Sequence, residues 1–463
     1  MALINKTEEF TPARLPTCPP ERLASSHPDR HLWITLVALS LVFFNVFPGI
    51  SSGQDKKIAV FGSSVAKGSG DTTGTGGYAG MFKTLLENRG WMVVNVSRGG
   101  DNTVKIMPRF EKELLPEKPG YVIIGLSLGN EGIANASELK RNRIFERFRS
   151  GILHLINLCR ENGMVPVVVN CYARNDFNQE QYEAVRKMNL LINTWNVASI
   201  NALGAIDDGT GKWAAGYWHD KSHPNEKGHR EIYYAIVPTL FDALGTGKKC
   251  PEKFRGSSYL SVSSGASAKP LVYIPDDTIH SFTVSFQVKS TDEGTVSALA
   301  GKNTHVTVSL ENGRIRFQTS ANEIFEADTS DENKGWQYVV ISYRHSTGHT
   351  VFYANGKPIG IRSGPLDFRE LILGGSGSEM VSPPQQAGYR ELMIFRSALN
   401  TDEVHALYND QLLQSSLEIY APLNDPVFRA GTEAANRAQS MSKLMITGSH
   451  LVSASEENGE TSK

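Results

Sequence analysis

The 463-residue chain has a formal net charge of −1, with 40% hydrophobic and 21% charged residues. That length allows two or three domains, and the composition excludes a chain dominated by disorder. The near-neutral balance gives no electrostatic basis for nucleic acid as a partner and argues against a globally basic, membrane-coating surface. We therefore expect a multi-domain globular protein, whose oligomeric state the sequence leaves open.

An apolar segment follows an N-terminal stretch of mixed charge. Residues 32–47 are apolar except for Thr35, Ser40 and Asn45, and small, turn-forming residues come directly after them. This pattern predicts an export signal or an uncleaved membrane anchor, while a buried core helix is the alternative because the run is short for a span. We expect residues 1–53 to be a tail with a signal peptide or anchor. The expected location is secreted, periplasmic or at the cell surface.

Strand and helix signals alternate over the next part of the chain. The clearest amphipathic pattern predicts a helix at residues 138–163, and a last helix is expected at residues 226–244. Continuous apolar runs predict strands at residues 57–61, 91–96, 121–125, 165–170 and 205–206. Such runs are typical of a parallel sheet that has both faces covered. Residues 54–248 are therefore expected to form an α/β three-layer sandwich.

The pattern changes after a polar linker at residues 249–258. Short alternating strands with turn pairs such as Asn312-Gly313 and Asn355-Gly356 continue, almost without helix, to residues 401–411. The predicted strands include residues 281–288, 306–310, 314–319, 337–343 and 351–354. This spacing predicts an all-β sandwich at residues 259–452. The small, polar and acidic residues 453–463 are expected to form a disordered tail.

Four polar blocks lie where a doubly wound fold would bring them together. Residues 62–64, 99–101 and 129–131 each follow a predicted strand, and residues 220–225 precede the last helix. Ligands of open α/β sheets bind beyond the carboxyl ends of the strands. These blocks are therefore expected to share one site.

The residue types in these blocks favour acyl transfer. A serine hydroxyl attacks only when a neighbouring imidazole accepts its proton, which Ser64 and His223 can arrange. Asp220 would fix the tautomer of the ring and stabilise the imidazolium. The tetrahedral intermediate needs hydrogen-bond donors, and the N–H groups of Ser64 and Gly100 and the amide of Asn130 are candidates. This chemistry requires no metal and no organic cofactor.

Residues 56–244 resemble the SGNH (GDSL-type) hydrolases, because the four blocks occur in that family's order. The resemblance implies a flavodoxin-like fold with Ser64 as nucleophile and with Asp220 and His223 as the acid–base pair. It also implies that the oxyanion hole is formed by Ser64, Gly100 and Asn130. The block around His223 is the most specific part, and Gly228-His229 nearby also resembles the family.

Two blocks depart from the family pattern, and both departures put the positioning of their loops in doubt. Ser63 replaces the usual Asp before the nucleophile, and Glu131 stands where the family has Asp after Asn130. With two adjacent serines, the spacing favours Ser64 but leaves Ser63 open. A competing G-x-S-x-G pattern surrounds Ser127, although no helix is expected directly after it.

Other short signals are weaker. The glycine-rich residues 68–77 and 245–248 lack the complete pattern of a phosphate-binding loop, and the first is expected to form a rim over the active site. His219 and His229 lie near His223 without a convincing metal-ligand spacing. Cys159 and Cys171 are expected to be small buried residues, with a disulfide between them left open.

The second domain resembles the laminin-G-like, concanavalin A-like jelly rolls. The resemblance is carried by residues 335–343, 351–357 and 390–395. Members of that fold often bind glycans or calcium, but no compact acidic cluster is apparent, and Asp276 and Asp277 could equally be turn residues. Fold alone does not identify a ligand, so a spacer role and carbohydrate binding stay equally open.

Together these features predict an exported serine ester hydrolase that acts through an acyl-serine intermediate. The expected substrate is an O-acyl ester on a glycan, for example an acetyl ester, because a jelly roll and an export segment accompany the hydrolase signals. One alternative is a lysophospholipase or thioesterase of the same fold. Another is a catalytically inactive, glycan-binding surface protein.

Overall fold

A five-stranded parallel sheet forms the centre of the first domain in the computed structural model, which describes residues 56–263, 269–330, 335–374, 383–448 and 451–455. The strand order is β2-β1-β3-β4-β5, the flavodoxin-like order. The strands are β1 (Lys57–Gly62), β2 (Met92–Asn95), β3 (Tyr121–Gly125), β4 (Val165–Val169) and β5 (Ala198–Ile200). The central strands are almost wholly buried, as their continuous apolar sequences predict.

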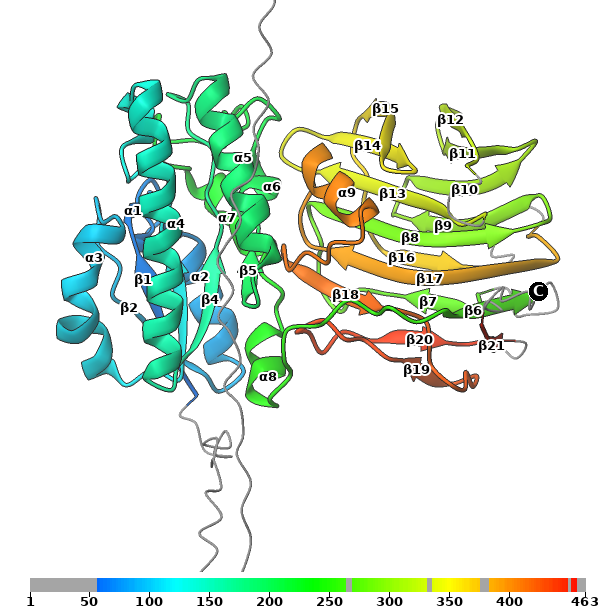
Figure 1. Ribbon diagram of the computed structural model, residues 1–463, viewed down its shortest axis with the longest axis horizontal. Coiled ribbons are helices and arrows are strands. Elements are labelled where there is room, and N and C mark those ends of the chain that lie inside the picture. The colour runs from blue at the N-terminus through cyan, green and yellow to red at the C-terminus, as the bar shows by residue number, and fades with distance from the viewer. Residues whose placement is uncertain (1–55, 264–268, 331–334, 375–382, 449–450, 456–463) are drawn as a thin grey trace, which may run out of the picture. The chain divides into compact units, whose positions relative to one another are not determined.

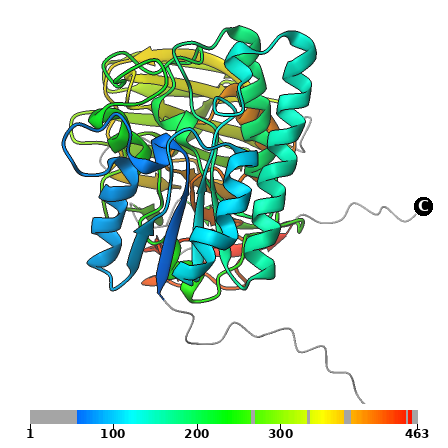
Figure 2. The same cartoon turned by 90° about the vertical axis from the view of Figure 1, so that its left-hand side faces the viewer.

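Helices cover both faces of this sheet, as Figures 1 and 2 show. Helix α2 packs against α7 on one face, and α4 packs against α3 and α5 on the other. The helices are α1 (Ser64–Lys67), α2 (Gly77–Glu87), α3 (Thr103–Arg109), α4 (Glu138–Glu161), α5 (Gln179–Thr194), α6 (Ala202–Ile206), α7 (Glu226–Tyr234) and α8 (Leu240–Gly245). The expected three-layer α/β sandwich is confirmed.

Two sequence predictions in this domain are wrong. Residues 205–206 end helix α6 and are not a strand, because the Asn201 side chain accepts a hydrogen bond from the N–H of Gly204 and starts a helix there. The last helix, expected at residues 226–244, is divided into α7 and α8. Pro238 lies between them, and a proline both lacks an N–H and disfavours helical backbone at the preceding residue.

Two antiparallel sheets form the second domain, to the right in Figure 1. One has the order β12-β11-β10-β9-β16-β7-β20-β19, and the other has β15-β14-β13-β8-β17-β6-β21, with β18 paired to β17. The first consists of β7 (Leu271–Tyr273), β9 (Gly294–Ala300), β10 (His305–Glu311), β11 (Arg314–Thr319), β12 (Ile324–Asp328), β16 (Glu370–Leu373), β19 (Thr432–Ala434) and β20 (Leu444–Ile446). The second consists of β6 (Ser258–Ser263), β8 (Phe282–Ser290), β13 (Gln337–Arg344), β14 (His349–Ala354), β15 (Lys357–Ser363), β17 (Gln386–Phe395), β18 (Leu417–Ala421) and β21 (Leu451–Ser455). Inward-facing apolar side chains of both sheets form one core, so the expected jelly-roll sandwich is confirmed.

The hairpin turns follow the sequence prediction. Asn312 and Gly313 have φ values of 52° and 71°, and Asn355 and Gly356 have 48° and 78°, as two-residue hairpin turns require. The end of the domain differs from the prediction. Strand β21 extends to Ser455 and pairs with β6, so the disordered tail predicted from residue 453 is wrong for residues 453–455. Pairing along β6 provides backbone partners that composition does not reveal.

The thiols of Cys159 and Cys171 are both free and buried. Burial raises the pKa of each to about 12, so both stay protonated and unreactive at neutral pH. The disulfide that the sequence left open is therefore not formed in this structure.

The predicted signal or anchor at residues 32–47, and the whole of residues 1–53, lie outside the described residues. Within the part of the chain that is described, no helix has both the length and the hydropathy needed to cross a bilayer.

The two domains meet through buried polar groups. The side-chain amides of Asn193 and Asn201 donate to Glu403 Oε1 at 2.8 and 3.0 Å. Glu403 lies in the first turn of helix α9 (Thr401–Tyr408), where it also closes a capping box with Asn400. The N–H of Ser416 donates to the carbonyl of Ser199 in β5 at 2.8 Å. The second domain therefore supplies backbone partners to the edge strand of the first.

Glu403 is expected to make stability depend on pH. Burial raises the pKa of Glu403 from its ordinary 4.5 to about 7. Hydrogen bonds from Asn400 and Ser415 and the positive charge of Arg344 oppose this rise. The folded protein then binds this proton more tightly than the unfolded chain does. Stability should therefore fall between about pH 4.5 and 7, by about 3 kcal/mol in all, and level off above pH 7.

Urea unfolding measured between pH 5 and pH 8 tests this expectation. Glu403→Gln should flatten the pH dependence, whereas Asp402→Asn, at the exposed neighbour in the same helical turn, should leave it in place. An equal slope in wild type and Glu403→Gln would mean that another group titrates.

Candidate active site

Ser64, His223 and Asp220 form a continuous hydrogen-bonded series at the carboxyl edge of the first sheet. Ser64 opens α1 directly after β1, and its Oγ lies 3.0 Å from Nε2 of His223. Nδ1 of His223 lies 2.8 and 3.0 Å from the two carboxylate oxygens of Asp220. A carboxylate at Nδ1 holds the proton there and leaves Nε2 as the acceptor that faces the serine hydroxyl.

The turn that carries Asp220 and His223 is held by its own backbone. Oδ1 of Asp220 accepts hydrogen bonds from the N–H groups of Ser222 and His223 at 2.7 and 3.0 Å. Burial by itself would raise the pKa of Asp220, but the hydrogen bonds from the His223 ring and the Ser222 N–H outweigh it and hold the pKa below its usual range. The carboxylate is therefore ionised at neutral pH and available to stabilise an imidazolium.

The two competing serines are not placed to attack a substrate. Ser63 and Ser127 are both completely buried, whereas Ser64 is partly exposed. Ser127 is followed by turns and then by the short 3-10 turn Ile133–Asn135, so the strand–turn–helix geometry of a nucleophile elbow is missing at that position. This burial agrees with the residue spacing, which favours Ser64.

The three donors expected for an oxyanion hole lie on three loops of the first domain. The N–H of Ser64 belongs to the first turn of a helix, where backbone donors have no partner inside the helix. Gly100 is exposed, in the left-handed region with φ 78°, on the loop that follows β2. Asn130 follows β3, and its Oδ1 accepts a hydrogen bond from the Tyr172 hydroxyl at 3.3 Å. Because its oxygen accepts this hydrogen bond, the Nδ2 group is the donor end of the Asn130 amide.

Tyr172, which the sequence did not predict at the site, contacts Asn130. Tyr172 comes shortly after the fourth predicted strand, so it lies at the same carboxyl edge as the other site residues. Its ring stacks on Trp213 with centroids 5.4 Å apart. Burial raises the pKa of Tyr172 to about 12, so its hydroxyl keeps the proton that it donates to Asn130.

Glu131, which departs from the family pattern, anchors the loop of Asn130. Arg147 on α4 donates to Glu131 Oε2 at 2.9 Å and to the carbonyl of Glu131 at 2.8 Å. The Glu131 side chain is completely buried. The buried Glu131 thus ties the loop that carries Asn130 to helix α4.

The glycine-rich residues 68–77 lie against the His223 turn, as expected for a rim. Gly70 has φ +95°, and a Cβ there would lie 2.1 Å from the carbonyl oxygen of Pro224, so only glycine fits. Buried His229 holds the same segment: its Nε2 lies 3.0 Å from the carbonyl of Ser69, and its Nδ1 accepts from the N–H of Tyr78 at 3.3 Å. Burial lowers the pKa of His229, so it is a neutral, structural histidine at neutral pH.

The histidines beside His223 do not form a metal site. Among the described residues, the group whose ligand atoms lie close enough to hold a metal ion consists of Glu231, His280 and His345. His219 and His229 are not part of it.

Comparison with known families agrees with the two folds. Residues 60–231 match the GDSL-like Lipase/Acylhydrolase family, and residues 256–405 match the Concanavalin A-like lectin/glucanases superfamily. The chain joins a GDSL-like acylhydrolase domain to a concanavalin A-like domain. Residues 60–231 are thus similar in sequence to acylhydrolases. The expected limits of 54–248 for this domain and 259–452 for the concanavalin A-like domain stay predictions.

Several individual proteins are similar to parts of the chain. The uncharacterized lipoprotein YqeF of Bacillus subtilis (strain 168) is 27% identical over 139 residues, which cover 29% of this chain and 56% of YqeF. The chain thus spans little more than half the length of that relative. A catalytic mutant of Axe2, an acetylxylan esterase from Geobacillus stearothermophilus, is 15% identical with a TM-score of 0.31, over 38% of this chain and 90% of that one. A SAP-like pentraxin from Limulus polyphemus is 13% identical with a TM-score of 0.30, and the match covers 43% of this chain and 96% of that one. At such TM-scores these structural similarities carry no functional conclusion.

Proposed function

We propose that the GDSL-like domain hydrolyses a carboxylic ester through an acyl-serine intermediate. His223 Nε2 accepts the Ser64 proton as Oγ attacks the carbonyl carbon, and the imidazolium then donates that proton to the leaving alkoxide. Asp220 holds the ring and stabilises its charged form. A water activated by His223 releases the acid and restores the serine. The observation that carries this proposal is the 3.0 Å contact between Ser64 Oγ and His223 Nε2, with Asp220 on the opposite ring nitrogen.

Labelling with a fluorophosphonate, followed by mass spectrometry of the modified peptide, tests the proposal directly. The label is expected on Ser64 and should disappear in His223→Ala. A label on Ser127 would overturn the assignment. The absence of any label would favour a catalytically inactive, glycan-binding surface protein.

We further propose that the N–H groups of Ser64 and Gly100 and the Nδ2 group of Asn130 form the oxyanion hole. Asn130→Ala should lower kcat about 10²–10³-fold with a much smaller change in KM, because the donor acts mainly on the charge of the transition state. Steady-state hydrolysis of p-nitrophenyl acetate measures this effect. Asn135→Ala, at an exposed position shortly after the same loop, is the matched control and should leave kcat unchanged. A fall of less than tenfold in Asn130→Ala would remove Asn130 from the oxyanion hole.

The proposed substrate is an O-acetyl group, or another short O-acyl group, on a glycan. Two features support it: the attached concanavalin A-like domain and Trp218, whose large side chain is 45% exposed two residues before Asp220. An exposed aromatic face beside the catalytic turn offers an apolar surface to a flat ligand such as a sugar ring. Release of acetate from an acetylated polysaccharide, lost in Ser64→Ala, is the expected result. Hydrolysis confined to lysophospholipids or long-chain thioesters would instead favour a lysophospholipase or thioesterase of the same fold.

We also propose that the protein is exported to the cell surface or beyond. Support comes from the apolar residues 32–47 and from the name lipoprotein carried by YqeF. Cell fractionation of the full chain and of a version lacking residues 1–53 tests whether this segment directs export. The full chain should leave the cytoplasm and the shortened one should stay there. Equal distribution of both would contradict export through this segment.

A further inference from the structure

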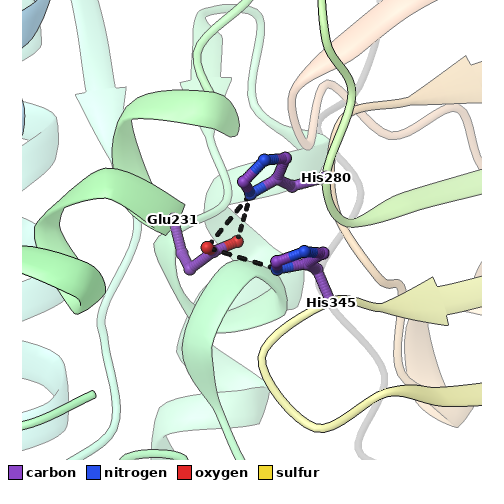
Figure 3. Close-up of side chains that lie close together, drawn as sticks. All are labelled: Glu231, His280 and His345. Carbon is purple, nitrogen blue, oxygen red and sulfur yellow. Dashed lines mark hydrogen bonds and ion pairs between the residues drawn. The ribbon is translucent and has the colours of Figure 1, made fainter. Parts of the chain in front are cut away.

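One glutamate and two histidines that are far apart in the sequence meet at the junction of the two domains (Figure 3). Glu231 lies on α7 of the GDSL-like domain, whereas His280 precedes β8 and His345 follows β13 in the concanavalin A-like domain. Figure 3 shows both rings pointing at one carboxylate. Nδ1 of His280 lies 3.0 and 3.1 Å from the two oxygens of Glu231, and Nδ1 of His345 lies 3.3 Å from Oε1.

These distances match the spacing of ligands around a small cation. A tetrahedral Zn²⁺ with bonds of about 2.0–2.1 Å to nitrogen and oxygen places its ligand atoms about 3.3 Å apart. The three ligand atoms of this cluster all lie within 4.8 Å of one another. Two imidazole nitrogens and one carboxylate oxygen are a donor set that suits Zn²⁺ and related transition metals better than Ca²⁺ or Mg²⁺.

Ring contacts hold the side chains close together, and one histidine ring must turn for both Nδ1 lone pairs to meet at one ion, because the two ring planes differ by only 25°. The His280 ring stacks on Tyr234 with centroids 3.7 Å apart and on His345 with centroids 4.0 Å apart. The backbone N–H of His345 donates to Ser281 Oγ at 3.1 Å, which joins the two histidine-bearing segments. The Glu231 side chain is only 4% exposed, whereas that of His345 is 38% exposed, so an ion can enter from the His345 side. A fourth position open to solvent would be filled by water.

We propose that Glu231, His280 and His345 bind one divalent transition-metal ion, with Zn²⁺ as the first candidate. The ligands are Oε1 of Glu231 and Nδ1 of each histidine, and both rings bind as neutral imidazoles that carry their proton on Nε2. The ion joins α7 to two segments of the concanavalin A-like domain and so acts as a structural clasp between the domains. This site is separate from the Ser64–His223 pair, and the proposal does not depend on ester hydrolysis.

Competition between the metal-free full-length protein and a chromophoric Zn²⁺ chelator tests the site. We expect one equivalent of Zn²⁺ to be bound, together with an upward shift of the thermal midpoint. His345→Ala should weaken binding by more than about 100-fold, since loss of an outer-sphere partner alone costs about 10–100-fold. His349→Ala is the matched control, because this exposed histidine lies in the same β13–β14 hairpin and should bind Zn²⁺ as wild type does.

Co²⁺ provides a second readout that depends on ligand geometry. Intense visible absorption bands, typical of four-coordinate Co²⁺, are expected in wild type and in His349→Ala and should be absent in His280→Ala. Binding far below one equivalent in wild type would overturn the proposal. So would unchanged affinity in the His280→Ala/His345→Ala double variant. Either result would leave the cluster as a hydrogen-bonded contact between the domains.

Discussion

His223→Ala and Ser64→Ala should each lower kcat for hydrolysis of a short-chain ester by about 10⁴–10⁶-fold, with far smaller changes in KM. Without His223 there is no acceptor 3.0 Å from Ser64 Oγ, and the hydroxyl keeps its proton. Without Ser64 no acyl-enzyme forms. The donors of the oxyanion hole would support the remaining activity.

The two variants should also be non-additive. If Ser64 and His223 act in one step, the double variant is no slower than either single variant. His219→Ala is the matched control, because His219 is an exposed histidine in the same loop. Its backbone N–H donates to the carbonyl of His223 at 2.9 Å, and the substitution leaves this hydrogen bond in place. Multiplicative losses in the double variant would show that the two residues act independently, and an unaffected Ser64→Ala would refute the proposed nucleophile.

Arg396→Met should destabilise the protein by about 3–5 kcal/mol, because it leaves a buried carboxylate without its cation. The Arg396 side chain has no exposed surface, and each of its five N–H groups meets an oxygen. Its partners are the carboxylate of Asp277 at 2.8 and 3.1 Å, Glu418 Oε2 at 2.8 Å, the carbonyl of Thr278 at 2.7 Å and the carbonyl of Tyr234 on α7 at 3.1 Å. Asp277, which the sequence left open as a turn residue, is therefore an ion-pair partner.

Urea unfolding measures this effect, and a second variant separates charge from packing. Adding Glu418→Gln to Arg396→Met removes the uncompensated charge, so the double variant should recover part of the loss. Arg314→Met is the surface control. Arg314 is 52% exposed and pairs with Glu326 at 3.2 Å, and a change there should cost less than about 1 kcal/mol. Equal losses in Arg396→Met and Arg314→Met would mean that the buried ion pairs do not stabilise the fold.

The positions of the site residues could be predicted from the sequence for a specific reason. Ser64, Gly100 and Asn130 each follow an apolar run, and the carboxyl ends of parallel strands meet at one edge of the sheet. Topology alone therefore brings the blocks together, and His223 joins them because its turn directly precedes α7. Tyr172 was missed because its hydrogen bond to Asn130 depends on side-chain packing and has no sequence signature.

Local sequence determined most elements of both folds. The period of the apolar residues separates the α/β part from the all-β part, and the Asn-Gly pairs specify hairpins at Gly313 and Gly356, because these turns need positive φ. Local signals failed where neighbouring elements decide. The apolar residues 205–206 are compatible with either a helix or a strand. The helix cap at Asn201 decides in favour of the helix.

Tertiary structure alone decided how the domains meet. Glu231, His280 and His345 are separated by tens of residues, and Asn193 and Glu403 by 210, so no spacing rule connects them. Their contacts arise when strands and helices from both domains pack together and bury charged groups that must then find partners. The sequence by itself predicted the candidate site at the edge of one sheet, because Ser64, Gly100 and Asn130 lie in loops after its strands and His223 lies just before α7. The buried polar junction between the domains followed only from the packing of distant segments.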